Sequence, residues 1–356
     1  MTWPCIKGTI ILKAGNPQEE DGALDYAAEI LKNGGVVAFP TETVYGLGAN
    51  ALDPQAVEKI YRAKMRPADN PLIVHVTGME QVKELVRFIP GEAAVLAGHF
   101  WPGPLTMIFN KKKLVPDITT AGLPTVAVRV PAHPLALKLI ARAGIPLAAP
   151  SANLSGRPSP TTAEHVLEDM AGRIAAILDG GPCSVGVEST VLSLLSSPPV
   201  LLRPGGVTLE KLKEVLQTEI RDLTAGQTED FKGTPPSPGM KYRHYAPRAP
   251  LYLVEGEGQE QKRRLAALSE NFTRQGYRVG LILFEESEGL FSAPVVKVLS
   301  SRREPHLAAE RLFAVLRCMD SLDVDVIVAE GLHEQEMGRA VMNRLRKAAT
   351  KIIKAT

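Results

Sequence analysis

The stretch GGVVAFPTETVYGLG, residues 34–48, carries the clearest indication of the fold class of this chain. Gly34 and Gly35 end a helical pattern, and the apolar run 36–39 that follows is typical of a buried strand. The hydroxyl side chains of Thr41 and Thr43 come directly after that strand. Open α/β sheets bind ligands at strand ends, so the stretch predicts an α/β domain with a polar loop at its ligand edge. Taken alone, the loop could equally be a turn in which Thr and Gly serve backbone geometry.

Helical and strand patterns alternate on both sides of this stretch, from residue 21 to residue 203. Asp21 is predicted to cap a helix through Leu31, and the pair Asp53-Pro54 is predicted to start a helix that ends near Arg62. The alternation is typical of an α/β domain with many strands. Further strands are predicted at 72–76, 105–109, 125–130, 146–149, 174–178, 190–195 and 200–203, and helices at 80–88, 134–142 and 162–170.

The composition changes between residues 218 and 250, where glycine and proline are concentrated, as in a linker. Beyond it, strands are predicted at 251–254, 279–284 and 324–329, a helix at 305–319, and a basic helix at 339–353 that closes the chain. A chain of 356 residues exceeds one typical core. We therefore predict three parts: an α/β domain (1–217), a linker (218–250) and a smaller α/β domain (251–356).

Charge and cysteine content restrict the functional classes. The formal net charge is +2, and neither the first 210 residues nor the remainder has the basic excess of a dedicated nucleic-acid binder. Cys5, Cys183 and Cys318 are far apart, which argues against a disulfide framework and a structural zinc site. No apolar run approaches the ~18 residues of a membrane span. A cytoplasmic location without membrane contact is the resulting expectation.

The common phosphate-binding and hydrolase motifs are absent from the sequence. There is no GxxxxGK[ST], and Gly46-Leu47-Gly48 lacks the third glycine and the downstream acidic residue of a dinucleotide fingerprint. Neither HExxH nor GxSxG occurs. Any nucleotide chemistry in this chain must therefore use a less common phosphate site.

The densest polar cluster is KMRPADNPLIVH, residues 64–75. Lys64 and Arg66 fall where a helix passes into a loop, a position that suits a polyphosphate. Two isolated cations at such a position more often belong to a solvated helix end than to a binding site. A histidine in an apolar strand, such as His75, is likewise more often a core residue than a ligand contact.

Other strand ends add further polar groups. Thr125 and Arg129 share one face of a predicted strand, and a buried Arg needs a carboxylate or phosphate partner. Ser151 and Asn153 follow a strand, the loop 186–190 leads into one, and Arg203 ends one. Each feature could be purely structural. Together they indicate one shared cleft.

Seven motifs follow one another in the first part of the chain: PTETVYGLG (40–48), KMRPADNPLIVH (64–75), FWPGPLT (100–106), TVAVRVPAHP (125–134), APSANLSGRPSPT (149–161), DGG with GVESTV (179–191) and RPG (203–205). In this order they resemble the motifs of the YrdC-like threonylcarbamoyl-AMP synthases, and the resemblance covers nearly all of residues 20–210. Two later stretches, SPGMKYRHYAP (237–247) and GRAVMNRLRKAA (338–349), are similar to the longer, two-domain form.

The resemblance implies a fold and a reaction. The fold would be a twisted open sheet flanked by helices, followed by a smaller Rossmann-like α/β domain. In the implied reaction, L-threonine and bicarbonate or CO2 form N-carboxythreonine, which attacks the α-phosphate of ATP to give threonylcarbamoyl-adenylate and pyrophosphate. Mg2+ would be the bridging ion, held by ATP and not by protein ligands. A separate transferase would then modify tRNA, so tRNA contact would be indirect or weak.

The resemblance also implies residue roles. Lys64 and Arg66 would be catalytic through the triphosphate, and Arg129 would hold the threonine carboxylate. The linker would cover the active site, with Tyr245 as an ATP contact and Lys241 as a weaker candidate. The implied threonine contacts are Thr43, His75, Arg129, the Ala149 backbone and Ser189, and the implied ATP contacts are Lys64, Arg66, Asn70, Thr125, Ser151, Asn153, Ser159, Arg203 and Tyr245.

Two alternatives remain at the level of sequence. One is a non-catalytic RNA-binding module that uses the cationic cleft, which the near-neutral charge disfavours. The other is an enzyme that passes a carbamoyl-adenylate to a different acceptor, as in hydrogenase maturation. Such enzymes normally carry zinc-finger and acylphosphatase modules, and this chain has no clustered cysteines to supply the zinc fingers.

Overall fold

The computed structural model describes residues 3–224, 235 and 244–355. Contacts within the chain group it into two compact units, each of which is described by itself. The first unit holds Met1–Ser155, Ser159–Ser184 and Glu188–Tyr242, and the second holds Gly156–Pro158, Val185–Val187 and Arg243–Thr356.

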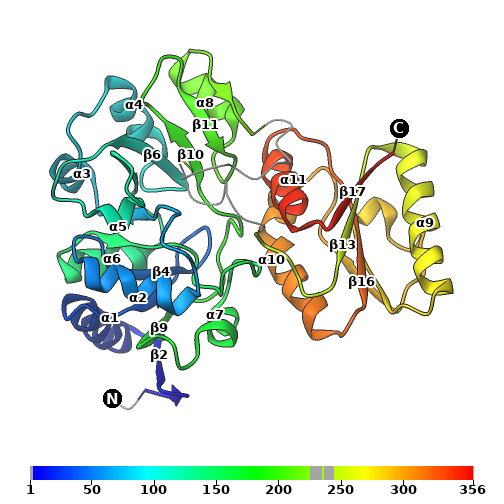
Figure 1. Ribbon diagram of the computed structural model, residues 1–356, viewed down its shortest axis with the longest axis horizontal. Helices are drawn as coiled ribbons and strands as arrows, with labels where there is room; N and C mark the ends of the chain where they lie inside the picture. The colour runs from blue at the N-terminus through cyan, green and yellow to red at the C-terminus, as the bar shows by residue number, and fades with distance from the viewer. Residues whose placement is uncertain (1–2, 225–234, 236–243, 356) are drawn as a thin grey trace. The chain divides into compact units, whose positions relative to one another are not determined.

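Within the described residues, the first unit is built on one mixed sheet of twelve strands (Figure 1). Its spatial order is β1-β2-β9-β3-β4-β8-β5-β7-β6-β10-β11-β12. The strands are β1 (Cys5–Ile6), β2 (Thr9–Lys13), β3 (Val37–Phe39), β4 (Gly46–Asn50), β5 (Ile73–His75), β6 (Leu105–Asn110), β7 (Thr125–Arg129), β8 (Leu147–Ala148), β9 (Ala176–Asp179), β10 (Thr190–Ser193), β11 (Val200–Arg203) and β12 (Arg221–Asp222).

Helices cover both faces of this sheet because its strands are apolar on both sides. Val37 and Phe39 belong to one core cluster, with residues of α1 and α6, whereas Ala38 belongs to the other, with residues of α2, α4, α7 and α8. Alternate side chains of one strand point to opposite faces, so a continuous apolar run serves two cores. The helices are α1 (Pro17–Lys32), α2 (Pro54–Lys64), α3 (Met79–Leu85), α4 (Gly91–Phe100), α5 (Asp117–Thr120), α6 (Pro134–Ala143), α7 (Ala163–Met170) and α8 (Leu209–Leu216).

Three sequence-based predictions in this unit are wrong in detail. α1 starts at Pro17, not after Asp21, because the Asn16 side chain accepts a hydrogen bond from the Glu19 amide and caps the helix there. Residues 46–48, predicted as part of the loop after the strand, lie in β4, which pairs antiparallel with β3. Arg221–Asp222, inside the predicted linker, pair with β11 as an edge strand.

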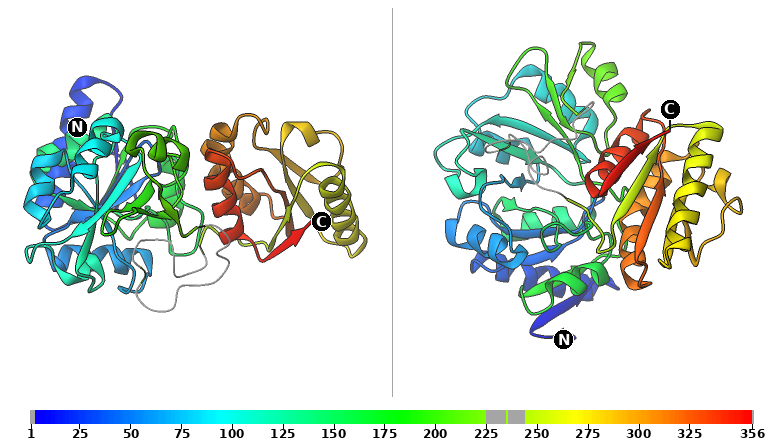
Figure 2. Two further views of the ribbon diagram at one scale, coloured as in Figure 1. Left: turned by 90° about the horizontal axis from the view of Figure 1, so that it is seen from above. Right: turned by 45° about the vertical axis from the view of Figure 1, so that its right-hand side comes forward.

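The second unit has a sheet of five parallel strands in its described part, in the order β15-β14-β16-β13-β17. Figures 1 and 2 show α9 on one side of this sheet and α10 and α11 on the other. The elements are β13 (Leu251–Glu255), α9 (Gly258–Arg274), β14 (Val279–Leu283), the 3-10 turn η1 (Glu285–Ser287), β15 (Val295–Val298), α10 (Pro305–Ser321), β16 (Val326–Glu330), α11 (Met337–Ala348) and β17 (Lys351–Lys354).

The end of the chain corrects another prediction. The basic helix predicted over 339–353 ends at Ala348, and Lys351–Lys354 form β17 beside β13. The pair Ile352-Ile353 is β-branched and favours a strand, and lysines at both ends suit an exposed edge. Across the described residues of both units, no helix is long and apolar enough to cross a membrane.

Candidate functional site

The loop after β3 is held rigid by its own hydroxyl groups. Thr41 Oγ1 accepts hydrogen bonds from the amides of Thr43 and Val44 and lies 2.8 Å from Thr43 Oγ1. Thr41, Glu42 and Thr43 are all buried, although they carry polar side chains. A hydroxyl that bonds to the backbone two and three residues on fixes such a turn. The turn geometry predicted for this loop is therefore confirmed, and its role as a ligand edge stays a prediction.

Arg129, the last residue of β7, is buried beneath this loop. Its Nη1 donates to Thr43 Oγ1 at 2.9 Å, and its Nε donates to the Gly103 carbonyl at 3.2 Å. Nη2 lies 2.7 Å from Glu42 Oε1 as an ion pair. The alignment of that pair is not that of a hydrogen bond, so Nη2 and both Glu42 oxygens have no hydrogen-bond partner among the described residues. A buried ion pair with unused hydrogen-bonding capacity is suited to a charged ligand.

His75 lies beside this pair, because β5 and β7 are parallel neighbours that place His75 opposite Arg129. Burial lowers the pKa of His75 to about 3, and the positive charge of Arg129 lowers it further in the same direction. The imidazole is therefore neutral at ordinary pH. Its Nδ1 is buried and has no hydrogen-bond partner within the described part of the chain.

Lys64 ends α2 with its ammonium group buried. Its Nζ donates to the carbonyls of Ser151 and Asn153, the latter at 2.7 Å, and lies 3.4 Å from Asn153 Oδ1. Met65 then adopts a left-handed conformation that ends the helix. The structure thus joins the Lys64 motif to the Ser151–Asn153 loop, as expected if the two form one cleft.

Arg66 and Asn70 form the next part of the site. Arg66 Nη2 donates to the Asn70 carbonyl at 3.0 Å, and its guanidinium lies 6.0 Å from the centre of the Tyr61 ring. The Asn70 side chain is fully buried, and neither its Oδ1 nor its Nδ2 has a hydrogen-bond partner in the described residues. Ile73 of β5 pairs with Ala127 of β7, so Asn70 enters the sheet at the Thr125 end of β7.

The pair Ser189 and Arg203 forms a third buried group. Arg203 donates from Nε to the Ser189 carbonyl at 3.0 Å and from Nη2 to Ser189 Oγ at 3.1 Å. Ser189 Oγ also lies 2.7 Å from Thr106 Oγ1. The hydroxyl of Ser159, which was predicted to bind ATP, donates a hydrogen bond to Glu188 Oε1 at 2.5 Å. Glu188 directly precedes Ser189 in the sequence.

The Ala149 amide donates a hydrogen bond to the Ile73 carbonyl, so a backbone contact from Ala149 to a ligand would have to use its carbonyl.

Tyr45 connects the loop after β3 to the DGG loop (179–181), since its hydroxyl donates to the Gly181 carbonyl at 2.8 Å and accepts from the Gly180 amide. Burial raises the pKa of the Cys183 thiol to about 12, which keeps it neutral.

Two predicted residues are not placed with these groups. Tyr245 belongs to the second unit, where its ring packs 5.1 Å from that of Phe313 and the Arg344 guanidinium lies 5.9 Å from its centre. Lys241 lies outside the described residues. Their contact with ATP stays a prediction.

Three residues that sequence reasoning missed are Glu42, Thr106 and Glu188. Each lies inside a quoted motif, next to or near a residue that was singled out. The signal in the sequence that could have identified Glu42 was Arg129, since a buried arginine needs a carboxylate partner.

In the described residues, no group of three or more His, Cys, Asp or Glu side chains is placed to hold a metal ion.

Comparisons with known proteins agree with this architecture. A family model described as "Telomere recombination" matches residues 29–205, and one described as "Threonylcarbamoyl-AMP synthase, C-terminal domain" matches residues 207–350. The threonylcarbamoyl-AMP synthase of Pyrococcus abyssi is 51% identical over 93% of this chain and 95% of its own length. That of Bacillus subtilis is 50% identical over 92% and 93%.

A solved structure gives the same result. The crystal structure of P. abyssi Sua5 complexed with L-threonine matches with a TM-score of 0.92 and 50% identity, over 98% of this chain and all of that one. The fold and the site define a two-domain α/β protein with a buried polar site in its first domain. This chain belongs to the threonylcarbamoyl-AMP synthase family, as the motif resemblance predicted. Membership identifies it as an enzyme and argues against the non-catalytic RNA-binding alternative.

Proposed function

We propose that this chain forms threonylcarbamoyl-adenylate and pyrophosphate from L-threonine, bicarbonate or CO2, and ATP. The observation that carries the proposal is the buried Arg129–Glu42 pair with its unused donors and acceptors. A free amino acid is a zwitterion, and a guanidinium beside a carboxylate complements both of its charges. The 50% identical relative whose structure contains L-threonine supports this assignment.

On the threonine side, Arg129 Nη2 would bind the substrate carboxylate, and Glu42 would accept a hydrogen bond from its ammonium group. The ammonium nitrogen loses two protons when it becomes the carbamate nitrogen. With bicarbonate one of them leaves in the water that is formed, and a buried carboxylate beside the nitrogen can accept the other; with CO2 the second proton would pass to solvent. The neutral His75 Nδ1 and Thr43 Oγ1 are available for the substrate hydroxyl. Ser189 and the Ala149 carbonyl would complete the pocket.

On the ATP side, Lys64 and Arg66 would bind the triphosphate, and the unpartnered Asn70 amide would contact the nucleotide. Thr125, Ser151, Asn153, Ser159, Arg203 and Tyr245 remain proposed contacts. Since the carbamate carboxylate is the nucleophile, these residues orient reactants and offset charge without a covalent enzyme intermediate. Mg2+ would arrive with the triphosphate, which is how this ion is usually held in nucleotide sites.

The direct test is incubation of the protein with ATP, Mg2+, bicarbonate and L-threonine, followed by mass analysis of the adenylate. Omission of threonine or bicarbonate should abolish pyrophosphate release. L-Serine should be a poorer substrate, since it lacks a methyl contact worth about 1 kcal/mol. Pyrophosphate release that is independent of threonine would contradict the proposal.

Two substitutions separate the halves of the site. Arg129→Ala should chiefly raise the KM for threonine, and Lys64→Ala should chiefly lower kcat, because the lysine acts on the developing phosphate charge. Arg62→Ala is the matched control, since Arg62 is exposed and pairs only with Glu58 among the described residues. If Lys64→Ala turns over normally, the phosphate assignment is wrong.

The adenylate is a precursor for threonylcarbamoyladenosine in tRNA, and we infer that a separate transferase consumes it. Direct tRNA binding is not required for the reaction, and the near-neutral charge of the chain supports an indirect role. We further propose that the proline-rich linker (218–250) covers the active site during turnover.

A further inference from the structure

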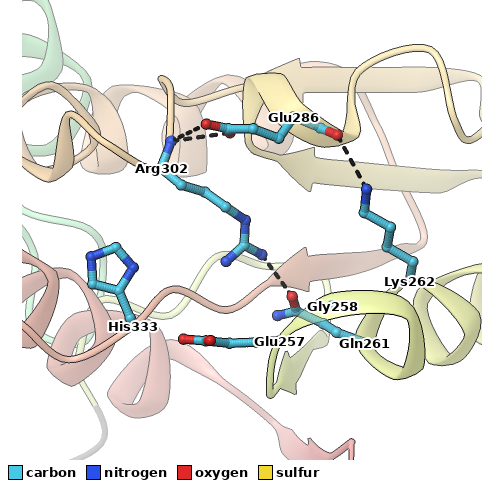
Figure 3. Close-up of a pocket in the computed structure, with 7 residues that line it drawn as sticks. All are labelled: Glu257, Gly258, Gln261, Lys262, Glu286, Arg302 and His333. Carbon is cyan, nitrogen blue, oxygen red and sulfur yellow. Dashed lines mark hydrogen bonds between the residues drawn. The ribbon is translucent and has the colours of Figure 1, made fainter.

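We propose that the second unit contains a separate binding site for a small phosphate ester that carries free hydroxyl groups, such as a pentose phosphate or nucleoside monophosphate. The site is a cavity of about 290 Å³ in the second unit (Figure 3). Its lining is drawn from the carboxyl ends of four parallel strands: Glu257, Gly258, Gln261 and Lys262 after β13, Glu286 after β14, Arg302 after β15 and His333 after β16.

The topology of the sheet accounts for a cavity at this place. β13 and β16 are adjacent parallel strands, yet β13 leads into α9 on one face and β16 leads into α11 on the other (Figure 1). The two connections diverge and leave a crevice beyond the strand ends. Ligands of open α/β sheets bind at such a switch point.

The Arg302 side chain is held in this cavity through one of its guanidinium nitrogens, while the other two keep N–H donors unused within the described residues. Its Nη2 lies 2.6 Å from Gln261 Oε1, 2.7 Å from Glu330 Oε1 and 3.1 Å from the Gly331 carbonyl, and its guanidinium lies 5.2 Å from the centre of the Phe284 ring. Neither Nε nor Nη1 has an acceptor in the described part of the chain. Figure 3 shows the guanidinium in the middle of the cavity, between His333 and Gln261.

The partner of Arg302 is a fully buried carboxylate. Glu330 also accepts hydrogen bonds from the Phe284 amide at 2.9 Å and the Ser287 hydroxyl at 2.7 Å, so both of its carboxylate oxygens have partners within the protein. A buried ion pair contributes little net stability compared with apolar packing. We infer that this network orients Arg302 toward a ligand.

The remaining lining favours a phosphate group. The first turn of α9 has no side-chain cap, and Gly258 stands there with a positive φ and open space where a Cβ would lie. Uncapped amides at the start of a long helix bind anions. Lys262 adds a second cation, whereas the Glu286 carboxylate is already occupied by the Arg302 amide and the Ser301 hydroxyl.

Glu257 indicates that the ligand carries hydrogen-bond donors in addition to its anionic group. Its carboxylate lines the same cavity, and it has no partner among the residues that the structure describes. Figure 3 shows it reaching across the cavity below Arg302. A free carboxylate repels inorganic phosphate but accepts hydrogen bonds from sugar hydroxyls, as acidic residues do in nucleotide-binding sheets. The combination therefore fits a phosphorylated sugar.

The test is amide hydrogen exchange on the full chain, followed by peptide mass analysis, with ribose 5-phosphate, AMP and inorganic phosphate as separate probes. Ribose 5-phosphate should protect the peptides that contain residues 256–262 and 300–304. Peptide position separates this site from the one in the first unit, which AMP would also occupy. Protection by AMP but not by ribose 5-phosphate in these peptides would identify the source as a nucleotide.

Substitutions complete the test. Lys262→Glu should raise the ribose 5-phosphate concentration for half-maximal protection by about tenfold or more, because a charge-assisted contact becomes a repulsion. Arg263→Glu, the same charge change on the next residue, which does not line the cavity, should have an effect of less than about threefold. Glu257→Gln should weaken ribose 5-phosphate but not inorganic phosphate.

Three results would overturn the proposal. They are the absence of protection by both phosphorylated sugars, equal effects of Lys262→Glu and Arg263→Glu, and binding of inorganic phosphate as tight as that of ribose 5-phosphate with no effect of Glu257→Gln. Lys262 and Glu257 are chosen because neither anchors the fold. Arg302 is avoided, since its loss would leave the buried Glu330 unpaired.

Discussion

Glu42 and Arg129 form the buried ion pair on which the proposed threonine site rests. Arg129 is oriented by Thr43 and the Gly103 carbonyl, so the guanidinium does not depend on Glu42 for its position. The 2.7 Å contact with Glu42 brings the carboxylate close without aligned hydrogen bonds. Both charges therefore retain capacity for a substrate, at the cost of desolvation that the rest of the fold must offset.

The first prediction concerns this carboxylate. Glu42→Gln should raise the KM for threonine about tenfold or more, because the amide cannot pair with the substrate ammonium as an ion. Pyrophosphate release measured against threonine concentration gives the value. Glu58→Gln, an exposed glutamate paired with Arg62, is the control and should leave KM unchanged. An unaltered KM in Glu42→Gln would remove Glu42 from the site.

The second prediction concerns His75 and pH. Its pKa is about 3 in the folded chain and 6.5 in the unfolded chain, so the unfolded state binds more protons between these values. The neutral histidine therefore contributes its full stability above pH 6.5, and that contribution is lost as pH falls. Between pH 6.5 and pH 5 the loss from this residue is about 2 kcal/mol.

His75→Gln should accordingly make urea unfolding of the first unit less sensitive to acid over this pH range. His99→Gln, the same substitution at an exposed histidine on α4, provides the control. The same slope in His75→Gln and the parent would mean that His75 titrates normally in the folded chain.

At the scale of elements, the site depends on close approach between short loops. The loop after β11 passes so near the Ser189 backbone that a Cβ on Gly205 would lie 2.3 Å from the Glu188 carbonyl and 2.4 Å from the Thr190 amide. These are backbone atoms, which cannot move aside independently. Gly205 therefore lets β11 place Arg203 against Ser189.

The third prediction follows from this geometry. Gly205→Ala should destabilise the first unit by about 2 kcal/mol, as overpacking does, and should lower activity by displacing Ser189 and Arg203. Gly98→Ala is the matched control: Gly98 lies in α4 with nothing near its Cβ position, so alanine should stabilise by about 0.5–1 kcal/mol. Denaturation midpoints test both, and a neutral Gly205→Ala would show that the loop can shift freely.

At the scale of the whole molecule, the chain consists of two units, each with its own sheet and core. All the described polar groups around Arg129 and Lys64 belong to the first unit. Tyr245, predicted to contact ATP, belongs to the second.

The fourth prediction concerns the linker and the second unit. Removal of residues 237–356 should leave threonine binding by the first unit intact but lower the rate of pyrophosphate release, since the linker would no longer cover the cleft. Threonine titration and pyrophosphate release measure the two effects. Kinetics equal to those of the full chain would exclude a gating role for the linker.

Much of this fold was predictable because its strands and helices carry strong local patterns. The runs around β6, β7 and β11 were located almost to the residue, since apolar β-branched segments bounded by turn residues favour strands. The errors came where local signals compete. Asn16, and not Asp21, caps α1, because a proline follows Asn16 directly and favours the first helical position. Lys351–Lys354 form a strand because they pair with the edge of the sheet at β13.

For the site, ordered motifs were enough to predict Lys64, Arg66, Arg129 and their hydroxyl neighbours as candidates, and their resemblance to a family indicated the reaction. The contacts of Arg129 with Glu42, and of Lys64 with the Ser151–Asn153 loop, became visible only in the folded chain. Contacts across such sequence separations depend on strand order and side-chain burial, which no local pattern encodes. The cavity at the strand ends of the second unit arose in the same way, from topology.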